Sequence, residues 1–341
     1  MTVLFSSKLS IREMAVVCRQ LSTAYNAGLP IISALQLVVD RGASIRARRA
    51  LLTMAELIRN GATLADAARA QEATFPDLFI VVLAAGETGG KLGALLNELA
   101  DHYEEMAKIA RAAKVAMVYP GLQLLSAWYL GTFALNIMKT ILDPSRGRIV
   151  FADYLSSYAS FQIKSHLIAL AVIAVIFILK RFGMLDSGIS IVKNHVWPIN
   201  QISRKFSMAR FFQCFALLLG AGIEIKQCIS RSAALTLNRI MERDLLQAIP
   251  FIVQGKTLAE AFARCKSFTR VDHEMVGVGE LSGELEATCK KLSEYHLAEA
   301  SSALKVGMRV MQVLITLVVG AVIGYIVISF YGRLYGSMLD L

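Results

Sequence analysis

The residues whose types and spacing come closest to a chemical site form a glycine-rich segment, which reads AGETGGKL from Ala85 to Leu92. It is similar to a phosphate-binding P-loop, in which backbone N–H groups and a lysine hold phosphate and a following Ser or Thr holds magnesium. Here Leu92 stands where that Ser or Thr is needed, and the preceding residues 78–85 have a helical pattern, whereas a P-loop follows a strand. The segment therefore does not predict nucleotide binding.

The same segment is typical of a tight turn between two helices. Gly86 and Gly90 are expected to adopt backbone conformations closed to other residues, and Glu87 is expected to accept hydrogen bonds from backbone N–H groups. A contact of Glu87, or of its counterpart Glu280, with a partner or a cation stays open as the alternative.

The histidines and cysteines form no pattern typical of a catalytic or metal site. The histidines lack ligand spacing and are expected at surfaces or interfaces; they are His102, His166, His195, His273 and His296. The five cysteines never form C-x-x-C, so they are expected to be small apolar core residues in a reducing compartment. No catalytic residue, cofactor or metal is predicted, and the chain is predicted not to be an enzyme.

An internal repeat relates the two halves of the chain. A shift of 194 positions aligns Gly28 with Gly222, and the stretch 61–67 with 255–261. After a one-residue deletion the shift becomes 193, and it aligns Gly86, Glu87, Gly90 and Leu92 with Gly279, Glu280, Gly283 and Leu285. A constant register over about 85 residues indicates duplication. The second copy has Glu284 in place of Lys91, which would repel a phosphate.

Composition places the chain in a membrane. Mean hydropathy is +0.53, 55% of the residues are hydrophobic and only 18% are charged, which is too apolar for an ordinary soluble domain. The net charge of +10 comes from Lys and Arg interleaved with Asp and Glu. This pattern favours the basic bias of cytoplasmic loops or an anionic membrane surface over nucleic acid.

Three uncharged runs predict membrane spans and divide the chain. The predicted order is a cytoplasmic helical module 1 at 1–112, a span at 113–138, a short periplasmic loop at 139–164, a span at 165–181, a cytoplasmic module 2 at 182–305, a span at 306–331 and a short periplasmic tail at 332–341. Each module is expected to hold about six helices, so the fold class is an all-α membrane protein with two homologous six-helix bundles and three transmembrane helices. Eight basic residues flank the spans inside against five outside, which favours a cytoplasmic N-terminus.

The predicted spans contain small residues at helix-packing spacing and one proline. Gly320 with Gly324, and Ala127 with Gly131, have helix-packing spacing, which indicates a dimer or bundle seam or merely the frequency of glycine in membrane helices. Pro120, after Tyr119, is expected to bend the first span near its cytoplasmic end.

The repeated motifs resemble those of a known family. The pattern comprises Ala-Gly at the end of the first helix, G-x-T-L-A-x-A, then F-P, then G-E-x-x-G-x-L, and Tyr-Pro entering a span. It resembles the inner-membrane platform proteins of type II secretion systems and type IV pili, over about residues 10–335. The chain is similar to the short type IVb or thin-pilus branch, because the extra N-terminal segment of many members is lacking. The second module departs from the pattern, because Thr269 follows Phe268 where F-P is expected.

The resemblance implies a scaffold of the bacterial inner membrane that joins a cytoplasmic assembly ATPase to pilin or pseudopilin subunits. It further implies contacts with other inner-membrane assembly proteins, a homo-oligomer and no catalysis. Its motif residues would be Gly28, Gly222, the two Gly-Glu turns, Tyr119 and Pro120. Two rivals remain. A prepilin-processing enzyme needs paired aspartates at the membrane face, which the spans lack, and a transporter needs more spans with polar residues inside them.

Overall fold

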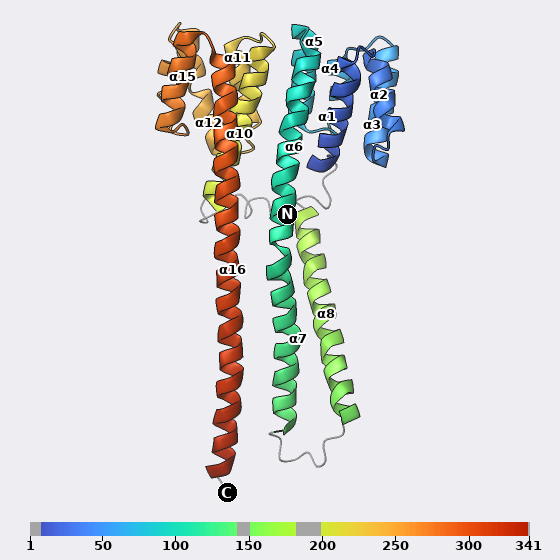
Figure 1. Ribbon diagram of the computed structural model, residues 1–341, viewed down its shortest axis with the longest axis vertical. Helices are drawn as coiled ribbons and strands as arrows, with labels where there is room; N and C mark the ends of the chain where they lie inside the picture. The colour runs from blue at the N-terminus through green and yellow to red at the C-terminus, as the bar shows by residue number, and fades with distance from the viewer. Residues whose placement is uncertain (1–7, 142–150, 182–198, 340–341) are drawn as a thin grey trace. The chain divides into compact units, whose positions relative to one another are not determined.

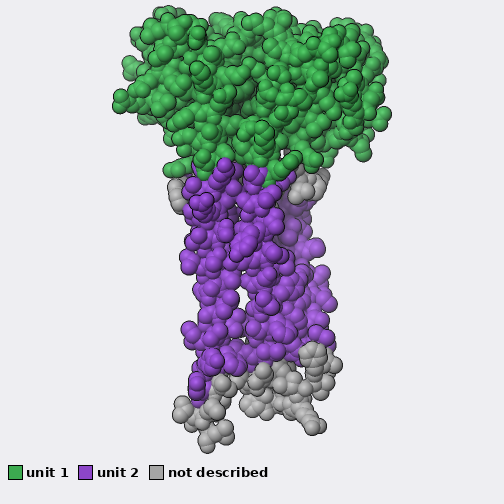
Figure 2. Space-filling view, viewed as in Figure 1, with its two compact units in different colours: residues 1–111, 201–302 green, residues 112–200, 303–341 purple. Residues whose placement is uncertain are grey.

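The computed structural model describes residues 8–141, 151–181 and 199–339, and every element in these ranges is an α-helix (Figure 1). The predicted all-α class is confirmed. The chain divides into two compact units (Figure 2). Unit 1 contains residues 1–111 and 201–302, and unit 2 contains residues 112–200 and 303–341.

Module 1 contributes six helices, of which the first five lie in unit 1 and the last continues beyond it. They are α1 Ile11–Asn26, α2 Ile31–Asp40, α3 Ile45–Arg59, α4 Leu64–Arg69, α5 Asp77–Gly89 and α6 Leu92–Ala116. Apolar residues at spacings of three and four point inward on each, and the centre holds Phe75, Phe79, Leu51 and Met54, which are fully buried.

Module 2 repeats this series with seven helices among the described residues. They are α10 Ile199–Gly220, α11 Ile225–Ala234, α12 Arg239–Leu246, α13 Ile249–Val253, α14 Leu258–Phe262, α15 Arg270–Ser282 and α16 Leu285–Leu339. Five phenylalanines fill its core with ring-to-ring contacts, namely Phe211, Phe212, Phe215, Phe262 and Phe268.

The expectation of about six helices in each module is wrong for module 2, and Pro250 gives the reason. Helices α12 and α13 together begin and end 194 residues after the single helix α3 of module 1. Pro250 lies in the first turn of α13, at the position of Glu56. Proline lacks the N–H that a continuous helix needs and its ring clashes with the preceding turn, so one helix becomes two.

Unit 2 contains α7 Val118–Ile141, α8 Phe151–Arg181 and the later part of α16. Hydrogen bonds join α7 to α8, including Trp128 Nε1 to Gln162 Oε1 (3.3 Å) and Gln162 Nε2 to Thr132 Oγ1 (2.8 Å). Most apolar side chains on these helices point outward.

Two of the described helices are long and apolar enough to cross a membrane, in α8 at Tyr154–Leu179 and in α16. Of the three predicted spans, those in α8 and α16 meet this criterion and the one in α7 does not. The uncharged run in α7 includes Gln123, Asn136 and Pro120. Lack of charge is thus not the same as apolarity, since an amide side chain also transfers unfavourably into hydrocarbon.

Some expectations fall outside the described residues. These are the middle of the predicted periplasmic loop at 142–150, the start of the predicted module 2 at 182–198 and the end of the predicted tail at 340–341.

Candidate functional site

The two Gly-Glu turns are the features that sequence singles out most strongly, and each carboxylate caps another helix. In module 1, Glu87 near the end of α5 accepts hydrogen bonds from Leu64 N (2.7 Å) and Ala65 N (2.9 Å), in the first turn of α4. The Thr63 side chain accepts a third bond from Asp66 N. A helix N-terminus has four N–H groups without intrahelical partners and a partial positive charge, so a carboxylate stabilises it.

Module 2 reproduces this arrangement with its own residues. Glu280 accepts from Leu258 N (2.6 Å) and Ala259 N (2.9 Å), and Thr257 caps the same helix, α14. The G-x-T-L-A and G-E motifs are therefore two halves of one tertiary contact. The contact closes a loop of about twenty residues in each copy, which no local pattern reveals.

The glycines of the turns serve two different purposes. Gly90 and Gly283 end α5 and α15 in the left-handed conformation, with φ of 66° and 75°. Gly86 does not adopt a special conformation, contrary to expectation, because it lies inside helix α5. What it provides is space, since a β carbon there would lie 3.0 Å from the backbone of Leu92. Gly279 is equivalent, with Thr288 Oγ1 at 2.7 Å from such a carbon.

The remaining motif residues lie at helix ends. Gly28 and Gly222 follow α1 and α10 with φ of 87° and 77°. Leu92 and Leu285 begin α6 and α16, and both pack against the core of unit 1.

Tyr119 and Pro120 lie in the first turn of α7, where a missing N–H costs no intrahelical bond. Instead of bending a helix from inside, Pro120 marks a break between α6 and α7 at Met117. The second copy has Val313 at the position of Pro120, and α16 runs for 55 residues without a break.

The seam residues of the spans differ in their surroundings. Gly131 faces Ile326 Cδ1, which would lie 3.9 Å from a β carbon at residue 131. Neither Gly320 nor Gly324 has a described atom within 4 Å of that position. A groove of about 560 Å³ separates α7 from α16, and small residues Ser126, Ala127 and Gly131 line its α7 side.

Lys91, the lysine of the P-loop-like segment, has a role that the sequence did not reveal. Its Nζ donates to Gly220 O (2.7 Å) at the C-terminal end of α10, so it ties module 1 to module 2. A cation there satisfies a helix-end carbonyl and complements the negative end of the helix dipole. The neighbouring Gly89 permits the approach, because a β carbon at that position would lie 2.2 Å from Ala221 O.

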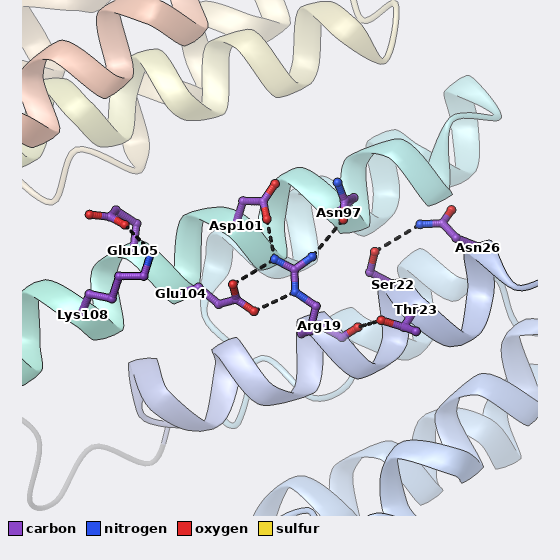
Figure 3. Close-up of polar contacts among 9 residues, drawn as sticks. All are labelled: Arg19, Ser22, Thr23, Asn26, Asn97, Asp101, Glu104, Glu105 and Lys108. Atoms are coloured by element: carbon purple, nitrogen blue, oxygen red, sulfur yellow. Dashed lines mark hydrogen bonds and ion pairs between the residues drawn. The ribbon is translucent and has the colours of Figure 1, made fainter.

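An arginine network of module 1 also escaped sequence reasoning (Figure 3). Arg19 on α1 donates to Glu104 Oε1 (2.7 Å), Asn97 Oδ1 (3.0 Å) and Asp101 on α6. The hydrogen bond from Arg19 holds the pKa of Glu104 below its ordinary value. The signal was present in the sequence as a polar stripe on α6 at spacings of three and four. Module 2 has Gln213 at the place of Arg19, bonded to Ser293.

A buried acid–histidine pair distinguishes module 2 from module 1. Asp272 Oδ1 lies 2.7 Å from His296 Nε2, and both side chains are buried. Asp272 also accepts from Thr269 N and Oγ1, completing a capping box that replaces the Pro76 start of α5. His296 is therefore not the surface or interface residue expected. Module 1 has Phe79 and Tyr103 at these positions, so the pair belongs to module 2 alone.

The cysteines lie as expected of core residues. All five are buried and free. Burial raises the pKa of Cys214, Cys228, Cys265 and Cys289 to about 12, and it raises the pKa of Cys18 further. A thiol that stays protonated and enclosed is a poor nucleophile.

Comparison with known proteins matches this geometry to a family. The model of the family described as Type II secretion system (T2SS), protein F matches the chain twice, at residues 17–138 and 211–332. Each match extends from a module into the helix that follows it, so the duplicated unit includes that helix.

Curated relatives cover most of the chain. A type IV pilus assembly protein PilC from Myxococcus xanthus is 25% identical over 94% of this chain and 79% of its own length. A type II secretion system protein F from Pseudomonas aeruginosa is 23% identical over 95% of this chain and 82% of its own length. A PilC from Thermus thermophilus is 23% identical with the same coverage. Two family matches across more than half the residues, in the register of the internal repeat, establish that the chain belongs to the type II secretion system protein F family.

Proposed function

We propose that this chain is an inner-membrane platform protein of a type IV pilus or type II secretion assembly machine. The single observation that carries the proposal is the duplicated helical module, each copy followed directly by a helix with outward-facing apolar side chains. Such a chain is built to hold other proteins at a membrane. The membership of the family and the names of its relatives support the same role.

The membrane topology follows from a parity argument. Residues 1–111 and 201–302 form one compact unit, so the segment between them crosses the membrane an even number of times. Because α8 is a candidate span, a second crossing is needed, and α7 is the other described helix of that segment. Its leucines support this role, since Leu122 and Leu130 are 63% and 69% exposed. We therefore infer three crossings, and the excess of basic residues on the side of unit 1 favours a cytoplasmic location for unit 1 and the N-terminus.

Coupling to an assembly ATPase is the mechanical part of the proposal. Helix α16 is continuous from Leu285 to Leu339, so motion imposed on module 2 passes directly into its apolar part. In module 1 the helix is interrupted at Met117, between α6 and α7, so the corresponding connection would act as a hinge. The cytoplasmic unit would bind the ATPase, and the apolar helices would contact pilin or pseudopilin subunits, other inner-membrane assembly proteins and further copies of the chain.

The test uses the full chain reconstituted in lipid nanodiscs. The cognate assembly ATPase is expected to bind these discs saturably and not to bind empty discs, while the chain alone hydrolyses no ATP. In cells, deletion of the gene is expected to abolish surface filaments or secretion. Intact filaments and secretion in the deletion strain would contradict the platform role.

A further inference from the structure

Two loops of unit 1 present aliphatic side chains to solvent at corresponding places in the two modules. The first joins α2 to α3 and is followed by Ile45, which is 82% exposed. The second joins α11 to α12 and presents Leu237 and Ile240, which are 72% and 63% exposed. We call residues 41–49 loop A and residues 235–243 loop B. The residues differ between the copies, yet both retain an exposed branched aliphatic side chain.

Loop A lies at the end of unit 1 from which α6 leaves. Arg19 pairs with Glu104, and Asn26 Nδ2 donates to Gly93 O, so α1 runs antiparallel to α6. The first turn of α1, with Glu13, is therefore beside the last residues of α6 in this unit. Glu13 is next to loop A, because Ser44 and Arg46 of this loop interact with its carboxylate. Burial opposes ionisation of Glu13, but hydrogen bonds from Ser44 and Ser10 and the charge of Arg46 hold its pKa below the ordinary value.

Loop B lies at the equivalent end of module 2. Ser207 Oγ and Arg210 Nη2 on α10 both donate to Thr236 O at 2.8 Å. Lys205, also on α10, pairs with Glu299 of α16 (3.3 Å), and residue 302 is the last of α16 in unit 1. At about 1.5 Å per residue, loop B is within roughly two helical turns of that exit.

Charge distinguishes loop A from an ordinary solvated turn. Arg41, Arg46, Arg48 and Arg49 are exposed, against one exposed acid, Asp40. Among the described residues, the side chains of Arg41, Arg48 and Arg49 have no ion pair. Loop B has Arg239 and Arg243 beside Glu242, and Asp244 is occupied by backbone bonds from Lys266 and Ser267. Loop A is thus basic, whereas loop B is close to neutral.

Backbone conformation gives an independent observation. Leu237 has φ of 55°, the one positive φ at a non-glycine residue in the described chain. A non-glycine residue in the left-handed region is strained, because its β carbon approaches the following carbonyl oxygen, and strain of this kind concentrates at functional sites. Here it holds a leucine outward where Thr236 and Asn238 anchor the turn on either side.

We propose that loops A and B rest on the anionic membrane leaflet next to unit 1, with Ile45, Leu237 and Ile240 among the lipid headgroups. The arginines of loop A would attract the anionic lipid, and the aliphatic side chains would enter the interface. Arg111, the last residue of α6 in unit 1, adds an exposed basic side chain at the same end of the unit. This inference rests on the proposed membrane location, and it fixes which face of unit 1 a partner protein cannot use.

The test places single labels on the full chain in nanodiscs. Because the native cysteines are buried, an introduced cysteine can be labelled selectively with a nitroxide. The variants are Ile45→Cys and Leu237→Cys. The matched control is Leu281→Cys, because Leu281 is 91% exposed and apolar but lies near the start of α16, at the opposite end of unit 1. Val318→Cys, on the apolar part of α16, reports whether the chain spans the bilayer.

The measurement is the accessibility of each nitroxide label to oxygen, which enters lipid, and to a nickel chelate, which stays in water. A label in contact with lipid has a high ratio of oxygen accessibility to chelate accessibility. In discs that contain phosphatidylglycerol, the ratio of oxygen to chelate accessibility is expected to be at least about fivefold higher for the labels at 45 and 237 than for the label at 281. Arg48→Glu with Arg49→Glu is expected to reduce this ratio at 45 severalfold, since each basic residue contributes separately to anionic-surface attraction.

The outcomes separate this inference from the proposed function. If the label at 318 is exposed to the chelate, the membrane location itself fails. If 318 is protected while 45 and 237 resemble 281, the lipid contact alone is overturned. Contact at 45 that is equal in phosphatidylcholine discs and insensitive to the arginine changes overturns the anionic assignment. Shielding of 45 from both reagents only when another protein is added assigns the surface to that protein instead.

Discussion

Removal of the Glu87 carboxylate tests the interpretation of the Gly-Glu turn as a tertiary helix cap. In Glu87→Ala, Leu64 N and Ala65 N lose their acceptors at 2.7 and 2.9 Å. Two hydrogen bonds to a charged group in a dry interior would contribute about 1.5–3 kcal/mol each. Glu87 is exposed, so in the variant water can bond to some of the freed N–H groups. The expected decrease in the free energy of unfolding is therefore that of a lost helix cap, about 1–2 kcal/mol. Glu87→Gln keeps one acceptor oxygen and is expected to cost about half as much.

Thiol labelling under native conditions measures this change within one module. Cys18 is the cysteine of module 1, and the other four belong to module 2; all are buried, so each reacts only after local opening. A loss of about 1–2 kcal/mol accelerates labelling roughly 5- to 30-fold. Glu87→Ala is therefore expected to accelerate Cys18 by this factor, with mass spectrometry of the labelled peptides resolving each site. Glu280→Ala is expected to accelerate the four thiols of module 2 instead.

The control variant is Glu72→Ala, which removes an exposed carboxylate that has no side-chain hydrogen bond among the described residues. Labelling of Cys18 within about twofold of the parent chain in Glu87→Ala would refute the capping role. Equal acceleration of all five thiols would refute the local part of the reasoning, because unit 1 would then open only as a whole.

Three further predictions concern packing, the buried pair and pH. Gly89→Ala forces a β carbon toward Ala221 O and is expected to lower the free energy of unfolding by about 1–3 kcal/mol, measured by denaturant titration in detergent. Asp272→Asn leaves His296 without its acid and is expected to cost about 3 kcal/mol, whereas Asp272→Phe with His296→Tyr, the residues of module 1, recovers most of it. Burial raises the pKa of the four module 2 thiols from about 9 to about 12, so between these pH values the unfolded chain loses thiol protons that the folded chain keeps. The free energy of unfolding is therefore expected to be unaffected by the thiols below pH 9 and to fall as the pH rises toward 12. Cys214→Ala is expected to make this fall smaller.

Each of these has a matched comparison. Gly121→Ala adds a β carbon where no described atom lies within 4 Å, so a loss as large as that of Gly89→Ala would contradict the packing argument. A double variant at 272 and 296 that is no more stable than Asp272→Asn would show that the pair is not separable from the rest of the core. A pH dependence unchanged in Cys214→Ala would exclude this thiol as a contributor.

The elements were predictable because they depend on neighbours along the chain. The stripe Met14, Cys18 and Leu21 repeats at spacings of three and four, and it lies on the buried face of α1. Glycine at 28 and 222 ends a helix in both copies because φ there is positive. The duplication was also readable, since a fixed offset survives divergence of individual residues. The two family matches begin 194 residues apart, in the same register.

The errors have specific physical causes. Gly86 was expected to have a special conformation, but its constraint is the approach of Leu92, which depends on how α5 and α6 pack. His296 was expected at a surface, but Asp272 and a stacked Phe212 make its burial tolerable. Helix α7 was expected to resemble the other spans in hydropathy because its apolar run lacks charge, but its amide side chains make it less apolar than the candidate spans in α8 and α16.

The sequence by itself determined the helical periods, the helix ends marked by Gly28 and Gly222, the repeat and the family, because each is written in residues close together or at one constant offset. Only the tertiary structure decided what the chemistry-like residues do. Lys91 bonds a carbonyl 129 residues away, and Glu87 caps a helix 23 residues earlier in the chain. Hydrogen bonds act over about 3 Å of space whatever the separation in sequence. The partners of a side chain are therefore known only once the helices have packed.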